Sequence, residues 1–345
     1  MQESTAGLPE FIAGLPKAEL HVHHVGSASP ATVAELAARH EGDSPVPADA
    51  EKLAEYFVFT DFDHFVQVYL SVVDLIRDAS DVRTLTWGVA QDLAAQNVRY
   101  AELTVTPWSS VRRGIPAEAF CEAIEDVRAA AARDLNLTLN WCFDIPGEAG
   151  TDAGEQTLDI ALRQRPDGLI SFGLGGPEVP RIDYKPFFDA ARASGLRSVP
   201  HAGETTNAQT MWDAITFLGA ERIGHGIRAV QDPALLEYLA STGIPLEVCP
   251  TSNVCTRAVP SLDEHPLAEL VAAGVQLSIN SDDPPMFSTT LNHEYLVAAR
   301  LLGLDRAGVA DLARAGVRHS FAPEALKTQL LAEISAYEES YAHRP

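Results

Sequence analysis

Leu15-Pro16-Lys17-Ala18-Glu19-Leu20-His21-Val22-His23-His24-Val25-Gly26 is the stretch from which the rest of this sequence can be interpreted. Its apolar residues predict a buried strand, and residues two apart in a strand project from the same face. His21 and His23 are therefore expected to point together, and His24 to point away from them. A lone His-x-His pair is also a common coincidence of a core or a surface. The two imidazoles form half of a metal site only if other ligands come from elsewhere in the chain.

The composition predicts a folded and strongly acidic protein. Hydrophobic residues make up 46% of the 345 residues, enough for a sizeable core, and charged residues make up 21%. The formal net charge of −23 argues against a nucleic-acid backbone or an anionic membrane as a partner. Such a charge also serves as a general solubility feature. A small-molecule partner is expected.

Cysteine usage and the start of the chain favour the cytoplasm. The 4 cysteines, Cys121, Cys142, Cys249 and Cys255, form neither a CxxC pair nor a compact disulfide framework. The first residues carry no basic segment followed by an apolar one, and no apolar run approaches the length of a membrane span. We therefore expect a cytoplasmic protein.

Short apolar segments alternate with stretches of helical period along the whole chain. The predicted strands are 18–24, 98–105, 138–145, 168–174, 196–201, 222–225, 245–249 and 275–281. Most gaps leave room for one helix, as in Pro116–Arg133 and Pro233–Thr242. This pattern predicts a (β/α)8 TIM barrel of the α/β class. A doubly wound open sheet is the alternative, but it would place a glycine-rich phosphate loop after the first strand, where His-Val-His stands.

The chain is expected to form a single domain over residues 1–345, with a core barrel at about 14–330 and a helical insertion at about 31–97. Within the insertion, Phe57–Ile76 carries apolar residues at spacings of three and four, which predicts one apolar helical face. Its members are Phe59, Phe62, Phe65, Val66 and Tyr69. They either pack into the core or form a lid over the barrel mouth, with Phe62 and Phe65 stacking on a flat ligand.

Polar residues follow several predicted strands at their carboxyl ends, where barrel enzymes place their active groups. They occur in His21-Val22-His23, Gly173-Leu174-Gly175-Gly176-Pro177-Glu178, His201-Ala202-Gly203-Glu204, Gly224-His225-Gly226 and Asn280-Ser281-Asp282-Asp283-Pro284-Pro285. Each group alone has a structural explanation, but a metal would explain their joint placement. His21, His23, His201 and Asp282 make a suitable zinc set with room for water. Iron, manganese and cobalt remain open from ligand type alone.

These residues resemble the adenosine deaminase family within the metal-dependent amidohydrolases. The resemblance spans roughly residues 14–330 and rests on four ordered motifs, Leu-Pro-Lys-Ala-Glu-Leu-His-Val-His at 15–23, His-Ala-Gly-Glu at 201–204, Arg-Ile-Gly-His-Gly at 222–226 and Ser-Ile-Asn-Ser-Asp-Asp-Pro at 278–284. It implies a hydrolase that removes the 6-amino group of a purine nucleoside, releases ammonia and uses one zinc ion per chain.

The resemblance also implies roles by position. His21, His23, His201 and Asp282 match the zinc ligands, and zinc lowers the pKa of a bound water to about 7. Glu204 matches the acid that protonates purine N1, and His225 matches the histidine that takes the water's proton or holds the oxyanion. Asp283 matches the carboxylate that contacts N7, and Gly176 matches the backbone amide that meets N3.

The first motif departs from the family's familiar His-x-His-Leu-Asp-Gly, because Val25 stands where an aspartate contacts the ribose 5′-hydroxyl. Burying a hydroxyl against valine costs on the order of 1–3 kcal/mol. This departure favours a substrate whose 5′-hydroxyl is absent or replaced. Relatives of this type deaminate 6-aminodeoxyfutalosine, a menaquinone precursor with a benzoate-bearing 5′ chain. Arg112 and Arg113 are candidates to bind its carboxylate, unless they form a solvated surface pair.

Three other functions remain open. The first is deamination of adenosine itself in purine salvage, with Val25 compensated by another polar group. The second is a barrel metallohydrolase with two metals bridged by a modified lysine near the fourth strand, where this chain has no lysine. The third is a barrel that binds nucleosides without turnover, which loss of a ligand or of the acid would mark. None of the four predicted metal ligands is missing from this sequence, and the predicted acid, Glu204, is also present.

Overall fold

Eight parallel strands lie side by side in chain order in the computed structural model, which describes residues 7–40, 42–59 and 62–342. The strands are β1 (Lys17–His23), β2 (Val98–Val105), β3 (Thr138–Pro146), β4 (Leu169–Gly175), β5 (Arg197–Ala202), β6 (Ile223–His225), β7 (Leu246–Val248) and β8 (Leu277–Ile279). Each lies within one residue of a predicted strand at either end, apart from β8, which is two residues shorter than predicted at each end. The consecutive order confirms the barrel and excludes the doubly wound sheet.

The barrel closes between its last and first strands through the chain that follows β8. Val22 and Asp282 form a parallel bridge. The backbone N–H of Asp282 donates to the carbonyl of His21 at 3.0 Å, and the N–H of His23 donates to the carbonyl of Asp282 at 2.9 Å. The backbone thus fixes three of the predicted metal ligands relative to one another.

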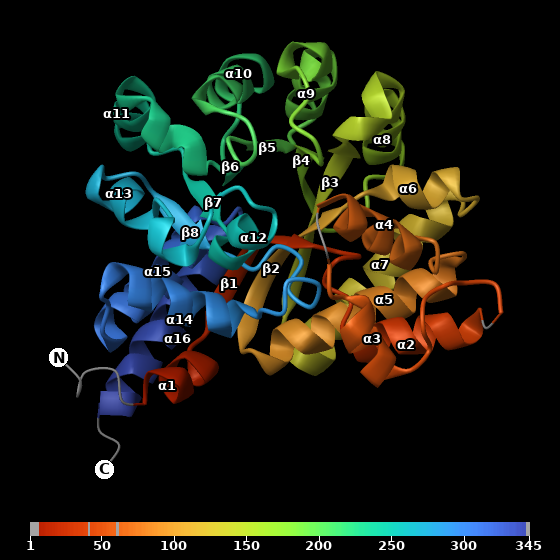
Figure 1. Cartoon of the computed structure of the whole chain (residues 1–345), viewed down its shortest axis with the longest axis horizontal. Coiled ribbons are helices and arrows are strands. Elements are labelled where there is room, and N and C mark those ends of the chain that lie inside the picture. Colours follow the sequence, from red (N-terminus) through yellow and green to blue (C-terminus); the bar gives the residue numbers. More distant parts are fainter. Residues whose placement is uncertain (1–6, 41, 60–61, 343–345) are drawn as a thin grey trace.

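Helices surround the strands, with α8–α11 on the outside of one half of the barrel and α14–α16 on the other (Figure 1). The helices are α1 (Leu8–Gly14), α2 (Pro30–Arg39), α3 (Ala50–Tyr56), α4 (Phe62–Val73), α5 (Ala79–Ala95), α6 (Pro107–Arg112), α7 (Ala117–Ala130), α8 (Gly150–Gln164), α9 (Lys185–Ala193), α10 (Ala208–Leu218), α11 (Pro233–Thr242), α12 (Pro250–Cys255), α13 (Leu267–Ala272), α14 (Leu291–Leu302), α15 (Arg306–His319) and α16 (Glu324–Ala342). Within the described ranges, none of them is both long and apolar enough to cross a membrane.

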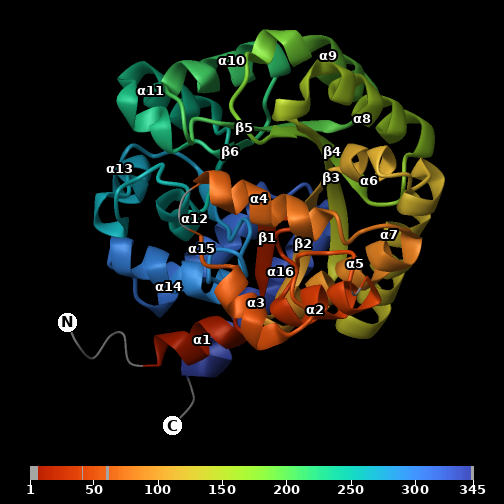
Figure 2. The same ribbon diagram turned by 45° about the vertical axis from the view of Figure 1, so that its right-hand side comes forward.

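Between β1 and β2 the chain forms helices α2–α5, and α4 lies across one end of the barrel (Figure 2). Val68 and Val72 on α4 are buried, and the ring of Phe65 lies 5.1 Å from that of Phe287, which follows β8. The expected helical face is partly wrong, because Phe59 precedes α4 instead of lying on it. Phe59 still packs edge-on against Phe65 at 5.2 Å.

Small residues on β4 leave room inside the barrel near its mouth. A Cβ atom on Gly173 or Gly175 would lie 2.5 Å from a carboxylate oxygen of Asp144 on β3. Phe172, directly before Gly173 in the alternating strand pattern, packs edge-on against Phe188 of α9 instead. The two glycines therefore allow a buried carboxylate to stand inside the barrel beside β4.

Candidate metal and active site

The four predicted metal ligands meet at the carboxyl ends of β1, β5 and β8. The Nε2 atom of His23 lies 3.2 Å from His201 Nε2 and 3.2 Å from Asp282 Oδ1. His21 Nε2 lies 3.8 Å from the same carboxylate oxygen. Ligands bound to one tetrahedral zinc at about 2.0–2.1 Å are separated by about 3.3 Å. The spacing therefore suits a single small metal ion.

Burial and hydrogen bonding also fit a metal at this position. His21 Nε2 is buried and has no hydrogen-bond partner, although its other ring nitrogen, Nδ1, lies 2.8 Å from Glu247 Oε2. A carboxylate can only accept, so Nδ1 carries the proton and Nε2 presents its lone pair to the cluster. An unpartnered acceptor among three ligand atoms is the arrangement that a cation would complete.

The two other imidazoles are held neutral, as metal ligands must be. Burial lowers the pKa of His23 to about 4. Burial, together with the neighbouring imidazoles, lowers the pKa of His201 well below its ordinary value. Asp282 accepts a hydrogen bond from the Ser252 hydroxyl at 2.6 Å, which fixes its second oxygen.

His21 is held in place by a buried chain of charged residues, Glu247, Arg222 and Glu102. Glu247 on β7 accepts from His21 and, at 2.6 Å, from Arg222 Nε. Arg222 also pairs with Glu102 on β2, and its guanidinium carbon lies 3.9 Å from the ring centre of Phe321. The arginine therefore offsets two carboxylates inside the barrel and holds one of them against a metal ligand.

Glu204 and His225 lie beside this cluster. His225 Nε2 is 3.6 Å from Glu204 Oε2 and 3.8 Å from Asp282 Oδ2. The Thr256 hydroxyl donates to Glu204 Oε1 at 2.9 Å. His225 and Asp282 both have left-handed backbones, with φ of 62° and 67°. Residues other than glycine rarely adopt this conformation except where a site requires it.

A hydrogen bond from Asn253 fixes the orientation of the His225 ring. Asn253 Nδ2 lies 3.1 Å from His225 Nδ1, and Asn253 Oδ1 lies 3.2 Å from His265 Nε2. Because the amide NH2 can only donate, Nδ1 of His225 accepts and the proton of the neutral ring is on Nε2. Nε2 faces Glu204 and Asp282, so His225 presents an N–H to the centre of the site.

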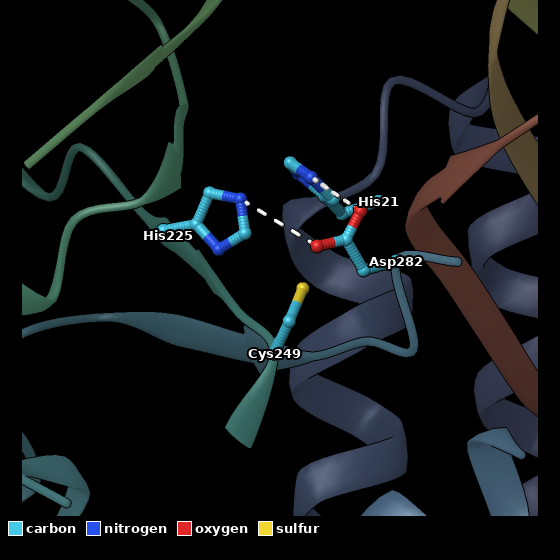
Figure 3. Close-up of side chains that lie close together, drawn as sticks. All are labelled: His21, His225, Cys249 and Asp282. Carbon is cyan, nitrogen blue, oxygen red and sulfur yellow. Dashed lines mark ion pairs between the residues drawn. The ribbon is translucent and has the colours of Figure 1, made fainter. Parts of the chain in front are cut away.

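Cys249, at the end of β7, lies next to the cluster. Figure 3 shows its side chain close to the Asp282 carboxylate and the His225 ring, with His21 on the far side of that carboxylate. Its sulfur lies within 4.8 Å of ligand atoms of His21, His225 and Asp282. Burial raises the pKa of the Cys249 thiol well above its ordinary value, so it stands there as a neutral thiol.

Asp283 and Gly176 line the same mouth. Gly26 packs so closely that a Cβ atom there would lie 1.5 Å from Asp283 Oδ1. Burial and the charge of Asp282 raise the pKa of Asp283 well above its ordinary value, so its carboxyl is protonated and can donate. Gly176 has φ of +71°, which turns the chain after β4, and a Cβ atom there would meet Glu148 at 2.6 Å.

The remaining predicted residues lie farther from the cluster. Val25 is half-buried and packs against the core, and Phe65 stacks on Phe287 beneath α4. Arg112 is exposed on α6, with its guanidinium carbon 5.0 Å from the ring centre of Trp108. The side chain of Phe62 lies outside the described part of the structure. His24 points away from the cluster and bonds to Thr86 at 2.8 Å.

Sequence reasoning missed the residues that support this site. Glu247, Arg222 and Glu102 are charged residues within predicted strands, and that placement was the available signal. Asp144 gave a similar signal near the end of a predicted strand. It is 4% exposed, and its Oδ1 has no hydrogen-bond partner. Burial raises its pKa well above the ordinary value, so its carboxyl is neutral at the mouth.

An eight-stranded barrel with imidazoles and carboxylates gathered at its mouth defines the class of metal-dependent barrel hydrolases. The chain belongs to the adenosine deaminase family, because the model of that family, described as adenosine deaminase, matches residues 16–337. The family is metal-dependent, and the cluster of histidines with Asp282 is a possible metal site.

Relatives over nearly the full chain agree with this assignment. Aminodeoxyfutalosine deaminase from Streptomyces avermitilis is 64% identical over 334 residues, covering 96% of this chain and 93% of that protein. The protein of the same name from Streptomyces coelicolor is also 64% identical, covering 96% and 86%. The crystal structure of adenine deaminase from Arthrobacter aurescens superposes with a TM-score of 0.88 at 31% identity, covering 94% and 99%. The predicted family, barrel and hydrolytic deaminase are confirmed.

Proposed function

We propose that the protein is a zinc-dependent deaminase of a purine nucleoside modified at its 5′ position, with 6-aminodeoxyfutalosine as its substrate. The observation that supports this most strongly is the 64% identity, over 96% of the chain, to proteins named aminodeoxyfutalosine deaminase. Val25 supports it independently, because valine stands where adenosine-specific members have an aspartate for the 5′-hydroxyl.

His21, His23, His201 and Asp282 would hold the metal. Zinc is the metal we favour, because three imidazoles and one carboxylate match its preferred ligands and the spacing of their donor atoms suits its bond lengths. When bound, zinc would lower the pKa of a water molecule to about 7 and so supply a nucleophile at neutral pH.

The side chains around the metal would hold the purine and move protons. Glu204 would donate a proton to N1 as C6 becomes tetrahedral, with the Thr256 hydroxyl fixing its orientation. His225 would hold the developing oxyanion by donating its Nε2–H, with Nδ1 fixed by Asn253. The protonated Asp283 carboxyl would donate to N7, and the N–H of Gly176 would donate to N3. Ammonia would then leave from C6.

The residue at position 25 offers a direct test of the substrate. Purified protein is assayed for ammonia release from 6-aminodeoxyfutalosine, adenosine and adenine, before and after Val25→Asp. We expect the unmodified protein to prefer 6-aminodeoxyfutalosine. We expect Val25→Asp to raise kcat/KM for adenosine relative to 6-aminodeoxyfutalosine by about tenfold, which corresponds to one hydrogen bond to a charged group. A substitution that leaves this ratio unchanged would show that Val25 does not face the 5′ group.

A further inference from the structure

Glu178 is a half-buried carboxylate in the loop that follows β4. Its Oε1 atom accepts from the backbone N–H of Glu204 at 2.7 Å and from that of Thr205 at 2.8 Å. Its Oε2 atom accepts from the N–H of Gly203 at 2.9 Å and from the Thr206 hydroxyl. One side chain therefore binds three consecutive N–H groups around the residue proposed as the acid.

The local backbone explains how one carboxylate reaches three donors. Gly203 has φ of +69°, which turns the chain directly after β5, and a Cβ atom there would lie 2.5 Å from the Met211 side chain. Glycine adopts this conformation without strain. Successive N–H groups at such a turn form a concave site for an anion, and here the carboxylate of Glu178 occupies it.

Glu178 is ionised in this position. Burial favours its neutral form, but hydrogen bonds from the Thr206 hydroxyl and from the three N–H groups hold the pKa of Glu178 below its ordinary value. Hydrogen bonds to an ionised acceptor are roughly twice as strong as those between neutral groups. The carboxylate therefore fixes the loop more firmly than a neutral side chain of the same shape would.

Three contacts fix the orientation of Glu204. Its N–H donates to Glu178, its carbonyl oxygen accepts from Arg228 Nε at 3.2 Å, and its Oε1 accepts from the Thr256 hydroxyl at 2.9 Å. Its second carboxylate oxygen, Oε2, lies 3.6 Å from His225 Nε2, beside the metal ligands. The contact with Glu178 is the shortest of the three, and it holds the backbone from which the acid projects.

The same loop is tied to the metal ligand His201. Arg181, three residues after Glu178, is 2% exposed and donates to the His201 carbonyl at 2.6 Å and to the Val179 carbonyl at 2.6 Å. Gly176, whose N–H is proposed to meet purine N3, lies two residues before Glu178. The loop from Gly176 to Arg181 therefore connects the N3 donor with the N1 acid and with a metal ligand.

We propose that Glu178 is a positioning residue for the deamination, whose carboxylate fixes the backbone of Glu204 so that the acid faces N1 of the purine. The inference rests on the proposed function, because Glu178 acts on the reaction only through Glu204. N1 and N3 belong to the same six-membered ring, so a loop that holds both the Gly176 N–H and the acid sets their separation. Misplacing the acid by about 1 Å would cost about 10²-fold in rate.

The first test is a double-mutant cycle on kcat with 6-aminodeoxyfutalosine. Glu178→Ala removes both acceptor oxygens and should lower kcat by about 10–100-fold, whereas Glu178→Gln keeps one of them and should lower kcat less. In a protein that already carries Glu204→Ala there is no acid to position, so adding Glu178→Ala should change the residual kcat by less than about twofold. Asp183→Asn, an exposed carboxylate five residues further along, is the matched control and should leave kcat unchanged.

The second test measures binding and needs no turnover. The 6-oxo product carries a hydrogen on N1, which the Glu204 carboxylate can accept, whereas the 1-deaza analogue of the product has a carbon in place of N1. Glu178→Ala should weaken binding of the product by about three- to tenfold, which corresponds to one hydrogen bond. Binding of the 1-deaza analogue should stay within about twofold, and the zinc content should not change.

An equal loss of kcat in both backgrounds, or an equal loss of affinity for both ligands, would show that Glu178 only stabilises the fold and would overturn the inference. A normal kcat for Glu178→Ala would overturn it as well. If Glu178→Ala does not fold, Glu178→Gln serves in the same comparisons, and if Glu204→Ala has no measurable turnover, the two affinities decide. An unmodified protein that releases no ammonia from 6-aminodeoxyfutalosine would instead contradict the proposed function, and the role of Glu178 with it.

Discussion

Glu247→Gln is the substitution that probes the buried support of the metal site most sharply. Glu247 is 1% exposed and accepts from His21 Nδ1 at 2.8 Å and from Arg222 Nε at 2.6 Å. Burial favours its neutral form, but Arg222 and His21 hold the pKa of Glu247 below its ordinary value, so it is ionised. Glutamine keeps the shape and offers only one acceptor, so its NH2 group must face one of the two donors.

The expected magnitude follows from that mismatch. Replacing a hydrogen-bonded partner of a metal-ligating histidine typically lowers metal affinity by about 10–100-fold. One buried donor is also left without an acceptor, which costs about 1–3 kcal/mol of folding free energy. Because His21 loses the acceptor that fixes its tautomer, we expect the loss to appear in zinc affinity as well as in stability.

The assay is a zinc competition titration against a chromophoric chelator, paired with urea unfolding of the zinc-free protein. Glu269→Gln, an exposed position on α13, is the matched control and should change neither quantity. A Glu247→Gln protein that binds zinc within twofold of the unmodified protein would refute the reasoning. A loss of stability with unchanged zinc affinity would show that Glu247 acts only as a structural partner of Arg222.

Three further predictions follow from the same contacts. Glu204→Gln should lower kcat by about 10²–10⁴-fold while zinc content and unfolding midpoint stay unchanged, and near-normal turnover would show that another group is the acid. Burial disfavours the charged form of His21, but Glu247 and Asp282 hold its pKa above 6.5. Because a protonated imidazole cannot bind the metal, zinc affinity should weaken about tenfold per pH unit as the pH falls below the pKa of His21. Equal zinc affinity at pH 8 and pH 6 would contradict this. Burial raises the pKa of Glu19 from 4.5 to about 8, so its neutral form stabilises the protein fully below pH 4.5 and that contribution is lost as pH rises through 8. Glu19→Gln should therefore gain stability relative to the unmodified protein by about 1.4 kcal/mol per pH unit over that range in urea unfolding, whereas parallel pH profiles would show that Glu19 does not titrate there.

The strand pattern of the barrel could be predicted because each strand is a short apolar run bounded by polar residues. The ends of those strands also identified the polar groups that the fold gathers, since carboxyl ends of parallel strands meet at one edge. The helical face at Phe57–Ile76 was less predictable. Periodicity continued through Phe59, but the helix begins at Phe62, and spacing alone carries no information about a helix start.

The buried charged residues that hold the metal ligand His21 in place could not be predicted from the spacing of residues in the sequence. Glu247 lies on β7, Glu102 lies on β2 and Arg222 directly precedes β6, and only the barrel's closure brings them into one buried chain. The space beside Val25 is likewise a product of packing, because residues at the ends of β1 and β2 and on helices α4–α7 surround it. The sequence identifies Val25 as a departure from the family's motif, whereas the space beside this side chain could be seen only in the structure.

The most direct test of the central claim is a comparison of kcat/KM for 6-aminodeoxyfutalosine and adenosine, measured by ammonia release with zinc-loaded protein. Zinc bound by the β1, β5 and β8 ligands, with Val25 at the 5′ end, predicts efficient deamination of 6-aminodeoxyfutalosine and a kcat/KM for adenosine at least about tenfold lower. A clear preference for adenosine, or turnover that persists after complete removal of the metal, would contradict the account.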